Sequence, residues 1–352
     1  MIKKIICCAV LFVSTAVFNF AQTPTPTPTL PVEIGTSVTD KEQNKDLPLQ
    51  SNQDALKLLK PTLDVILTEA QKQTDAYREA FKDLLGTETK TFEEYDKNGD
   101  LDERSIIESI FLVYQSPKNP DRSSELRNIL RVDEKLVPDS QARADRFLGE
   151  LEKTKTLEKE LEKIQDESLR YDRTIRIIGF TLFEAITLAK NMRPYFDYKL
   201  VGEENIEGRS VYVVSYQQTK KSPYVAINGK AVTGEGVYAE YELSLPGALK
   251  KNDIFLRGKL WIDAQTFQIR REERQVTVQA NGAPLVAQET VFEYTPSEFE
   301  ILVPKRITFL DNRLKKISKS DNFNATKDTQ VIFDYSKFKK TNVEVQIIDD
   351  EP

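Results

Sequence analysis

The sequence predicts an α+β fold in which an open antiparallel half-barrel wraps over helices, with a helical hairpin inserted between its strands. Three patterns indicate this fold. Residues 61–85 carry a helical apolar face, residues 121–192 have a helical composition, and strand-like segments follow one another from Tyr198 onward. A sheet with one dry face needs another layer to cover that face. The helices are therefore expected on the inner side of the sheet.

Residues 1–21 have the organisation of a secretory signal peptide. Lys3 and Lys4 form a short positive start, the run from Ile5 to Phe20 is almost wholly apolar, and Ala21 precedes a plausible cleavage point. The apolar run is shorter than the roughly 20 residues that a spanning helix needs. The chain is therefore expected to be exported to the periplasm or the extracellular space and not to be transmembrane after cleavage. An uncleaved membrane anchor is the alternative.

The composition excludes several kinds of chemistry. The chain has no histidine, and its two cysteines, Cys7 and Cys8, lie inside the predicted signal. Ser-His-Asp and Cys-His catalysis and His-ligated zinc or iron sites are thereby excluded. Phosphate-binding glycine loops are missing from the sequence. We therefore expect no enzyme activity, no cofactor and no metal site.

The formal net charge indicates which partners are unsuited to the chain. It is −6 for the whole chain and becomes −8 when the two signal lysines are removed. An acidic chain without a concentrated basic face is a poor match for nucleic acid or an anionic membrane surface. Nucleic acid is therefore not an expected partner.

Residues 22–50 are predicted to be a Pro/Thr-rich disordered tether, because Thr23-Pro-Thr-Pro-Thr-Pro28 favours extended geometry. Residues 51–120 are predicted to form a helix and the first β-hairpin. The helix is expected from Pro61 to Leu85, ended by Gly86. Its apolar face has spacings of three and four and consists of Leu63, Ile66, Leu67, Ala70, Tyr77, Phe81, Leu84 and Leu85.

The hairpin is predicted from the turn Asp96-Lys97-Asn98-Gly99, which separates strand-like segments 87–95 and 101–114. The same acidic turn has some likeness to a calcium loop. However, its glycine stands fourth instead of sixth, and Ile107 occupies the position where an EF-hand has its bidentate glutamate. The hairpin is therefore the favoured interpretation.

Residues 121–192 are predicted to be a helical insertion. Leu126, Ile129 and Leu130 open it, and a second, more apolar helix is expected from Ile175 to Met192. Between them runs a narrow apolar seam of the kind used in coiled coils. Its members are Phe147, Leu151, Leu157, Leu161 and Ile164.

Residues 193–347 are predicted to complete the sheet. Alternation of polar and apolar residues and the turn chemistry of Asn228-Gly229 and Asn281-Gly282 delimit the strands. The expected strands are 211–216, 237–245, 255–262, 267–280, 285–294, 301–309 and 329–335.

The apolar residues of the dry face are the candidate ligand site, because sheets that enclose one ligand use mostly apolar walls with a few polar handles. The alternative is that the same side chains simply pack against the helix at 61–85. The candidate cavity-lining residues are Tyr212, Val214, Tyr241, Leu243, Leu260, Ile262, Phe292 and Tyr294.

Weaker patterns point elsewhere. Ser336 and Lys339 have the S-x-x-K spacing of a Ser-Lys nucleophile pair, but they lie in a charged run after a strand. Acidic pairs such as Glu240 and Glu242 could serve glycoside hydrolysis, but solvated strand faces are the favoured interpretation. No catalytic residue is assigned from these patterns.

Two short motifs resemble strand pairs of the periplasmic outer-membrane lipoprotein-sorting (Lol-type) carrier superfamily. The first is Gly202-Glu-Glu-Asn-Ile-Glu-Gly208, of the form G-x-E-x-[IV]-x-G, and the second is Gly258-Lys-Leu-Trp-Ile-Asp263. The hairpin at 92–99 is similar to the first hairpin of secreted bacterial relatives of unknown function. The resemblance implies an incomplete antiparallel barrel over helices, with an inner apolar cavity that binds acyl chains. The helical stretch at 121–192 and the tether depart from that pattern.

Two functions follow from these observations. The first is an exported binding or carrier protein for an acyl chain or another apolar small molecule or lipid, held on the inner face of the sheet. The alternative is a non-catalytic structural or interaction protein of the envelope, which docks on an envelope protein through the helical insertion. A carboxylate enzyme acting on envelope glycans ranks third.

Overall fold

The computed structural model describes residues 4–6, 60–81, 84–116, 119–140, 142–143, 146, 166, 168–172, 175–177, 181, 185–228, 239–280, 282–317 and 322–340. The chain divides into two compact units, residues 1–14 with 63–352 and residues 15–62. Every element described below belongs to the first unit. The predicted tether at 22–50 lies outside the described residues.

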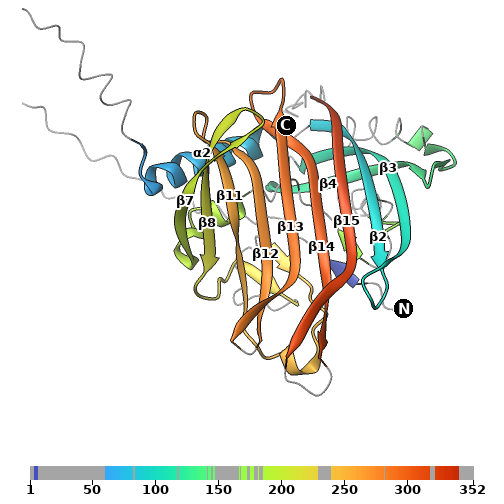
Figure 1. Cartoon of the computed structure of the whole chain (residues 1–352). Coiled ribbons are helices and arrows are strands. Elements are labelled where there is room, and N and C mark those ends of the chain that lie inside the picture. The colour runs from blue at the N-terminus through green and yellow to red at the C-terminus, as the bar shows by residue number, and fades with distance from the viewer. Residues whose placement is uncertain are drawn as a thin grey trace, which may run out of the picture. The chain divides into compact units, whose positions relative to one another are not determined.

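The main element of the first unit is an antiparallel sheet of eleven described strands (Figure 1). Their spatial order is β5-β4-β3-β2-β15-β14-β13-β12-β11-β8-β7. Among the described strands the edge strands β5 and β7 do not pair with each other, so the sheet is open, as the sequence predicts. The strands are β2 (Leu84–Tyr95), β3 (Leu101–Ser116), β4 (Asn119–Val132), β5 (Lys135–Leu136), β7 (Phe196–Ile206), β8 (Arg209–Gln218), β11 (Ile254–Asp263), β12 (Ile269–Ala280), β13 (Ala283–Pro296), β14 (Leu302–Lys316) and β15 (Phe323–Lys340).

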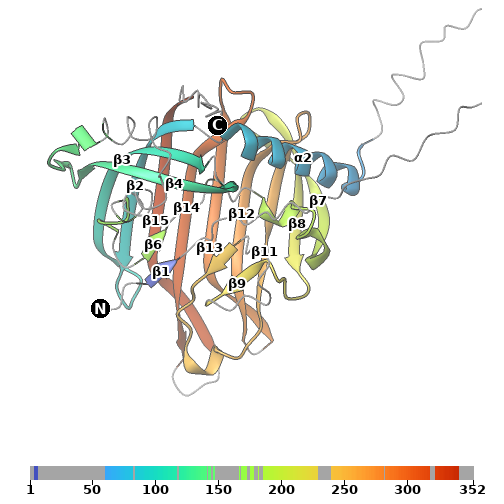
Figure 2. The same cartoon turned by 180° about the vertical axis from the view of Figure 1, so that it is seen from behind.

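Helix α2 (Leu63–Phe81) covers part of one face of this sheet, which we call the inner face (Figure 2). Its buried side chains follow the predicted helical spacing through Ile66, Ala70 and Tyr77. The Tyr77 ring meets the Tyr294 ring of β13 edge to face, with centroids 6.0 Å apart. The helix ends earlier than predicted, because Leu84, Leu85 and Gly86 belong to β2. Their burial comes from the sheet and not from a helical face.

The turn between β2 and β3 is built by the side chain of Asp96. Its Oδ1 accepts hydrogen bonds from the backbone N–H of Asn98 (2.7 Å) and Asp100 (3.0 Å). Gly99 has a φ of 91°, which glycine adopts without strain. The acidic side chain of the turn therefore satisfies backbone donors, and the hairpin predicted at Asn98-Gly99 is present.

The predicted helical hairpin is not observed, because α2 is the single α-helix that the described elements include. Residues 119–132 form strand β4, which pairs with β3. Along β4, Glu125, Arg127 and Ile129 alternate on the buried inner face. Because two of these inner-face residues are charged, the sequence of β4 lacks the alternation of apolar and polar residues that predicts a strand. The pairing of their charges in the interior can be seen only in the structure.

The second predicted helix, 175–192, is also wrong where it is described. Residues Ile175–Ile177 form strand β6, which pairs in parallel with β1 (Lys4–Ile6). The 3₁₀ turn η2 (Ile186–Leu188) follows, and η3 (Arg193–Tyr195) leads into β7. The apolar seam from Phe147 to Ile164 lies outside the described residues.

The segment 237–245 differs from the prediction of a long strand in the main sheet. Among its described residues, 239–245, the strand is β10 (Ala239–Tyr241), which pairs in parallel with β9 (Val225–Ile227) as a separate two-stranded sheet. Figure 2 shows β9 in front of the main sheet, on the face that carries α2. The Gln288 side chain of β13 donates a hydrogen bond to the Glu242 carbonyl (2.9 Å), which fixes the chain after β10 on the inner face.

Candidate functional site

The structure brings six of the eight predicted cavity residues together on neighbouring strands of the main sheet. On β8 and β11, Tyr212 lies opposite Ile262 and Val214 lies opposite Leu260. Phe292 and Tyr294 follow on β13, two strands away. The remaining two, Tyr241 and Leu243, lie on β10 and just after it.

These eight side chains belong to one buried apolar cluster. Their exposed fractions run from 0% for Val214, Leu260, Ile262 and Phe292 to 8% for Tyr212 and Leu243. α2 and η2 contribute to the same cluster through Ile66, Phe81, Ile186 and Leu188. The main-sheet members therefore pack against the cover of the sheet, as the packing alternative requires. Of the eight, Leu243 also lines the pocket described below.

A buried ion pair stands in the middle of this packed cluster. Arg274 donates from Nε and NH2 to the two carboxylate oxygens of Glu272 (2.9 and 2.8 Å). The same carboxylate accepts the Tyr216 hydroxyl (2.8 Å) and the backbone N–H of Ala185 (2.9 Å). Burial, followed by the charge of Glu272, raises the pKa of Tyr216 well above its usual value. The pair thus anchors the start of η2 on the inner face.

A second charged group lies on β2 and β4, and we call it the ion-paired cluster (Glu88, Lys90, Glu125, Arg127 and Asp172). Arg127 contacts Glu88 (2.6 Å) and Glu125 (2.8 Å), and Lys90 contacts Asp172 (2.8 Å). All five side chains are at most 4% exposed. Burial acts to raise the pKa of Glu88, but the charge and hydrogen bonds of Arg127 outweigh it and lower that pKa. In this cluster the Arg127 guanidinium therefore faces two carboxylates, and the Lys90 ammonium faces one.

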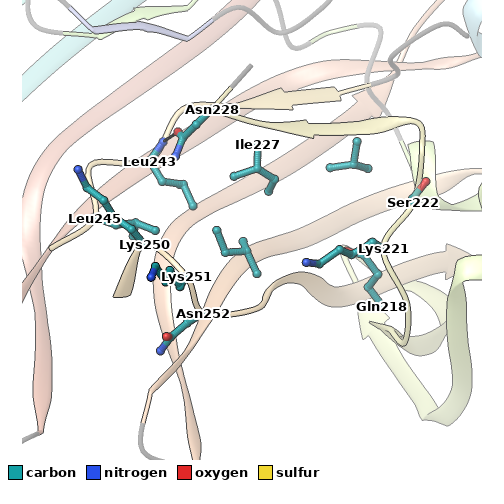
Figure 3. A pocket seen from close by; sticks show the side chains of 12 residues that line it. Gln218, Lys221, Ser222, Ile227, Asn228, Leu243, Leu245, Lys250, Lys251 and Asn252 are labelled. Atoms are coloured by element: carbon teal, nitrogen blue, oxygen red, sulfur yellow. Dashed lines mark hydrogen bonds between the residues drawn. The ribbon is translucent and has the colours of Figure 1, made fainter. Parts of the chain in front are cut away.

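The pocket lies where β8 ends and β11 begins, beneath the β9–β10 pair (Figure 3). Its volume is about 540 Å³. Its apolar wall comes from β9, from the segment after β10 and from the first residue of β11. The lining residues are Gln218, Lys221, Ser222, Val225, Ile227, Asn228, Leu243, Leu245, Lys250, Lys251, Asn252 and Ile254.

Hydrogen bonds hold the pocket wall in place without a ligand. The Asn228 side chain accepts the backbone N–H of Leu243 (2.7 Å). Gln218 Oε1 accepts the backbone N–H of Leu256 (2.9 Å), and Asn252 donates to the Gln279 carbonyl. The amide side chains of the pocket lining thus fix the backbone. The apolar side chains, among them Ile227 and Leu243, point into the space between them (Figure 3).

Sequence reasoning found only Leu243 of the described lining residues. Two of the others, Gln218 and Ile254, are the terminal residues of β8 and β11. The rest lie on or beside short segments around β9, β10 and η4 (Gly247–Leu249), which are too short to show a clear hydrophobic period. The sequence feature that could have indicated the charge at the pocket rim is two pairs of adjacent lysines, Lys220-Lys221 and Lys250-Lys251. The sequence gives no reason to place them together.

The other sequence candidates occupy ordinary positions. Ser336 and Lys339 are exposed on β15, on either side of a positive φ at Lys337. Burial, followed by the charge of Glu242, raises the pKa of Glu240. Among the described residues, no three potential metal ligands of the His, Cys, Asp and Glu types are grouped. Within the same residues, no helix has the length and apolarity needed to cross a membrane.

Comparisons with known proteins give distant structural likenesses. No family model matches the chain, and no curated protein matches it in sequence. Among solved structures it is similar to an outer-membrane lipoprotein-sorting protein domain from Vibrio parahaemolyticus, with 10% identity, a TM-score of 0.33, and 80% of this chain and 94% of that chain covered. A DUF1329 family protein from Desulfovibrio piger gives 11% identity, a TM-score of 0.34, and coverages of 82% and 95%.

A third similar structure is a LolA superfamily protein from Nitrosomonas europaea, with 10% identity, a TM-score of 0.29, and coverages of 80% and 94%. The superfamily that the sequence motifs indicated is therefore among the structures that this chain resembles. The resemblance is distant.

Proposed function

We propose that this chain is an exported, non-catalytic binding or carrier protein that holds an apolar ligand, such as an acyl chain, in the pocket beneath β9 and β10. The observation that carries the proposal is the pocket itself, an open volume of about 540 Å³ on the inner face of the sheet. Export rests on the signal-like residues 1–21, with residues 22–50 as a tether.

The size and lining of the pocket support this function. Small-molecule sites commonly have volumes of about 300–1,000 Å³ and mostly apolar walls with a few placed polar groups. Here Val225, Ile227, Leu245 and Ile254 supply apolar surface. Leu243 joins the pocket to the packed cluster that contains the other seven predicted residues. In the proposal those seven residues pack behind the pocket-lining residues, and Leu243 contacts the ligand.

Binding of a fluorescent fatty acid to the purified mature chain tests the proposal, together with native mass spectrometry of the protein as isolated from the envelope. Ile227→Trp would fill the pocket and is expected to weaken binding at least about tenfold, because the ligand loses both volume and wall contacts. Leu136→Trp is the matched control, since Leu136 is 67% exposed on β5, at the opposite edge of the sheet from β8 and β11. Failure of the unmodified chain to bind, with no lipid detected by mass spectrometry, would refute the proposal.

The interaction alternative depends on residues 145–170, of which the structure describes only 146, 166 and 168–170. It remains a prediction, tested by deleting the undescribed part of that stretch and asking whether an envelope complex is lost. No observation in the described residues favours it over ligand binding.

A further inference from the structure

Three lysines from two segments that are distant in the sequence line the pocket. Lys221 stands on the loop after β8, whereas Lys250 and Lys251 stand on the turn after η4. Figure 3 shows Lys221 on one side of the pocket and the other two on the opposite side. The described lining residues include these three lysines and no aspartate or glutamate. This local excess of positive charge contrasts with the net charge of −6 of the whole chain.

Buried neighbours hold each lysine at the rim. Ser222, 2% exposed, lies beside Lys221 and contacts the sulfur of Met192 (3.4 Å). Leu249, 1% exposed, lies beside Lys250, and its carbonyl accepts the backbone N–H of Asn252 (3.1 Å). The backbone at both rims is therefore fixed, so the lysine side chains stay close to the pocket entrance even though they are mobile at their tips.

Within the described residues the positive charge at the rim is only partly neutralised. Lys221 contacts Asp253 at 3.4 Å, but both side chains are exposed, at 68% and 60%. Such a surface pair contributes little and exchanges readily with other anions. No described acidic side chain lies within ion-pair distance of Lys250 or Lys251. An anion at the pocket entrance would thus find donors that have no strong competing partner.

We propose that the ligand is an amphiphile with an anionic head, a carboxylate or a phosphate, whose acyl tail fills the apolar pocket while Lys221, Lys250 and Lys251 bind the head. This inference rests on the proposed function, because it assigns the head to the same pocket that is proposed to hold the tail. The lysines would also set the orientation of the ligand, with the tail inside and the head at the rim.

The test compares four ligands that share one tail, each used below its micelle concentration: dodecanoate, dodecyl phosphate, dodecanol and dodecyltrimethylammonium. Isothermal titration of the mature chain is expected to show that the two anions bind about three- to tenfold more tightly than the alcohol, as several partly exposed ion pairs would produce. The cation is expected to bind most weakly. The preference should shrink as salt shortens the screening length from about 30 Å at 0.01 M to about 8 Å at 0.15 M.

Substitutions of the rim lysines test whether these residues cause the preference for anionic over neutral ligands. Lys250→Gln with Lys251→Gln is expected to bring dodecanoate affinity down to that of dodecanol and to leave dodecanol affinity unchanged. Lys339→Gln with Lys340→Gln is the matched control, because this exposed lysine pair lies near Leu84 and Leu85, at the opposite end of the sheet. The control is expected to retain the full preference for anions.

The outcomes separate the two proposals. Equal affinity for anion and alcohol would overturn the inference and leave the proposed function standing. No binding of any of the four ligands would refute both. Binding to vesicles that contain anionic lipid, without binding of the monomeric anions, would overturn the inference in favour of a membrane-surface role for the lysines.

Discussion

The ion-paired cluster and the pocket occupy the same face of one sheet but are built in opposite ways. In the cluster, Arg127 and Lys90 contact carboxylates in a solvent-free interior. At the pocket, a volume of about 540 Å³ remains open and three lysines stand at its rim. Filled, charge-paired regions stabilise a fold, whereas open volume and unneutralised charge lower its stability and are retained where they serve binding. The two regions thus contrast a buried, charge-paired part of the fold with the pocket that we propose binds the ligand.

The largest expected effect comes from breaking the ion-paired cluster. Arg127→Leu would leave Glu88 and Glu125 buried without their guanidinium, which costs about 3–5 kcal/mol of unfolding free energy. Urea denaturation followed by circular dichroism measures the loss. Arg306→Leu is the control, because its pair with Asp334 is nearly half exposed and is expected to contribute at most about 1 kcal/mol. Equal losses in the two variants would show that the cluster is not tightly buried.

A matched pair of leucine substitutions sharpens the contrast between packing and binding. Leu260 is 0% exposed in the packed cluster, so Leu260→Ala is expected to cost about 3–5 kcal/mol through the cavity that it leaves. Leu245 lines the pocket, where one side already faces open space, and Leu245→Ala is expected to cost about 1 kcal/mol or less. Fatty-acid affinity should respond in the reverse order, with the larger loss in Leu245→Ala. If Leu260→Ala weakens binding more, the ligand lies deeper than proposed.

A smaller loss is expected at Gly258, in the segment that resembles the Lol-type strand. A Cβ added there would collide with the Glu273 carbonyl and with the Tyr216 ring, whose hydroxyl bonds Glu272. Gly258→Ala is expected to cost about 1–3 kcal/mol through this overpacking. Gly202→Ala is the control, since no atom lies within 4 Å of the added carbon. The melting temperatures of the two variants provide the measurement, and a stable Gly258→Ala protein would contradict the close approach.

The smallest effect is expected from Asp263, which joins the turn after β11 to Arg270 (2.7 Å). Burial acts to raise the pKa of Asp263, but hydrogen bonds from Arg270 and from the N–H groups of Thr266 and Gln265 lower it well below its usual range. A lowered pKa stabilises the fold above the unfolded-state value near 4, and this contribution is lost as the pH falls. Asp263→Asn is expected to cost about 1 kcal/mol at pH 7, because the amide oxygen can still accept the N–H groups of Gln265 and Thr266, so that the charge of the bond to Arg270 is what is lost.

The difference in unfolding free energy between Asp263→Asn and the unmodified chain should narrow as the pH falls from about 5 to about 2, because the carboxylate of the unfolded chain binds a proton in this range before that of the folded protein does. Denaturant titrations at several pH values test this narrowing. A difference that stays constant over this range would show that the carboxylate charge does not contribute to stability.

Much of the fold could be predicted from the sequence, because its signals are local. The Asn98-Gly99 turn, the face of α2 and the alternation along β11 to β15 each require only a few neighbouring residues. One error arose where buried residues are charged. β4 was predicted to be helical because Glu125 and Arg127 do not look like inner-face residues until Glu88 is seen beside them.

The candidate site could be predicted less well than the fold. Six of its eight residues do share the inner face of the main sheet, as their alternation indicated. Their strand neighbours and α2 fill that face, however, and the open volume lies at its margin. Whether a row of apolar side chains is packed or lines a void depends on the elements laid over it, and β9, β10 and η4 are too short to be recognised in the sequence.

The sequence by itself therefore determined strands β2, β3, β8 and β11 to β15, the hairpin and helix α2, because hydrophobic periodicity and turn chemistry act over a few residues. The tertiary structure decided which buried charges neutralise one another and where space remains. The ion pair of Lys90 with Asp172, and the three lysines around one pocket, join segments that are far apart along the chain. Electrostatic and packing energies depend on distance in space, and only the folded sheet sets those distances.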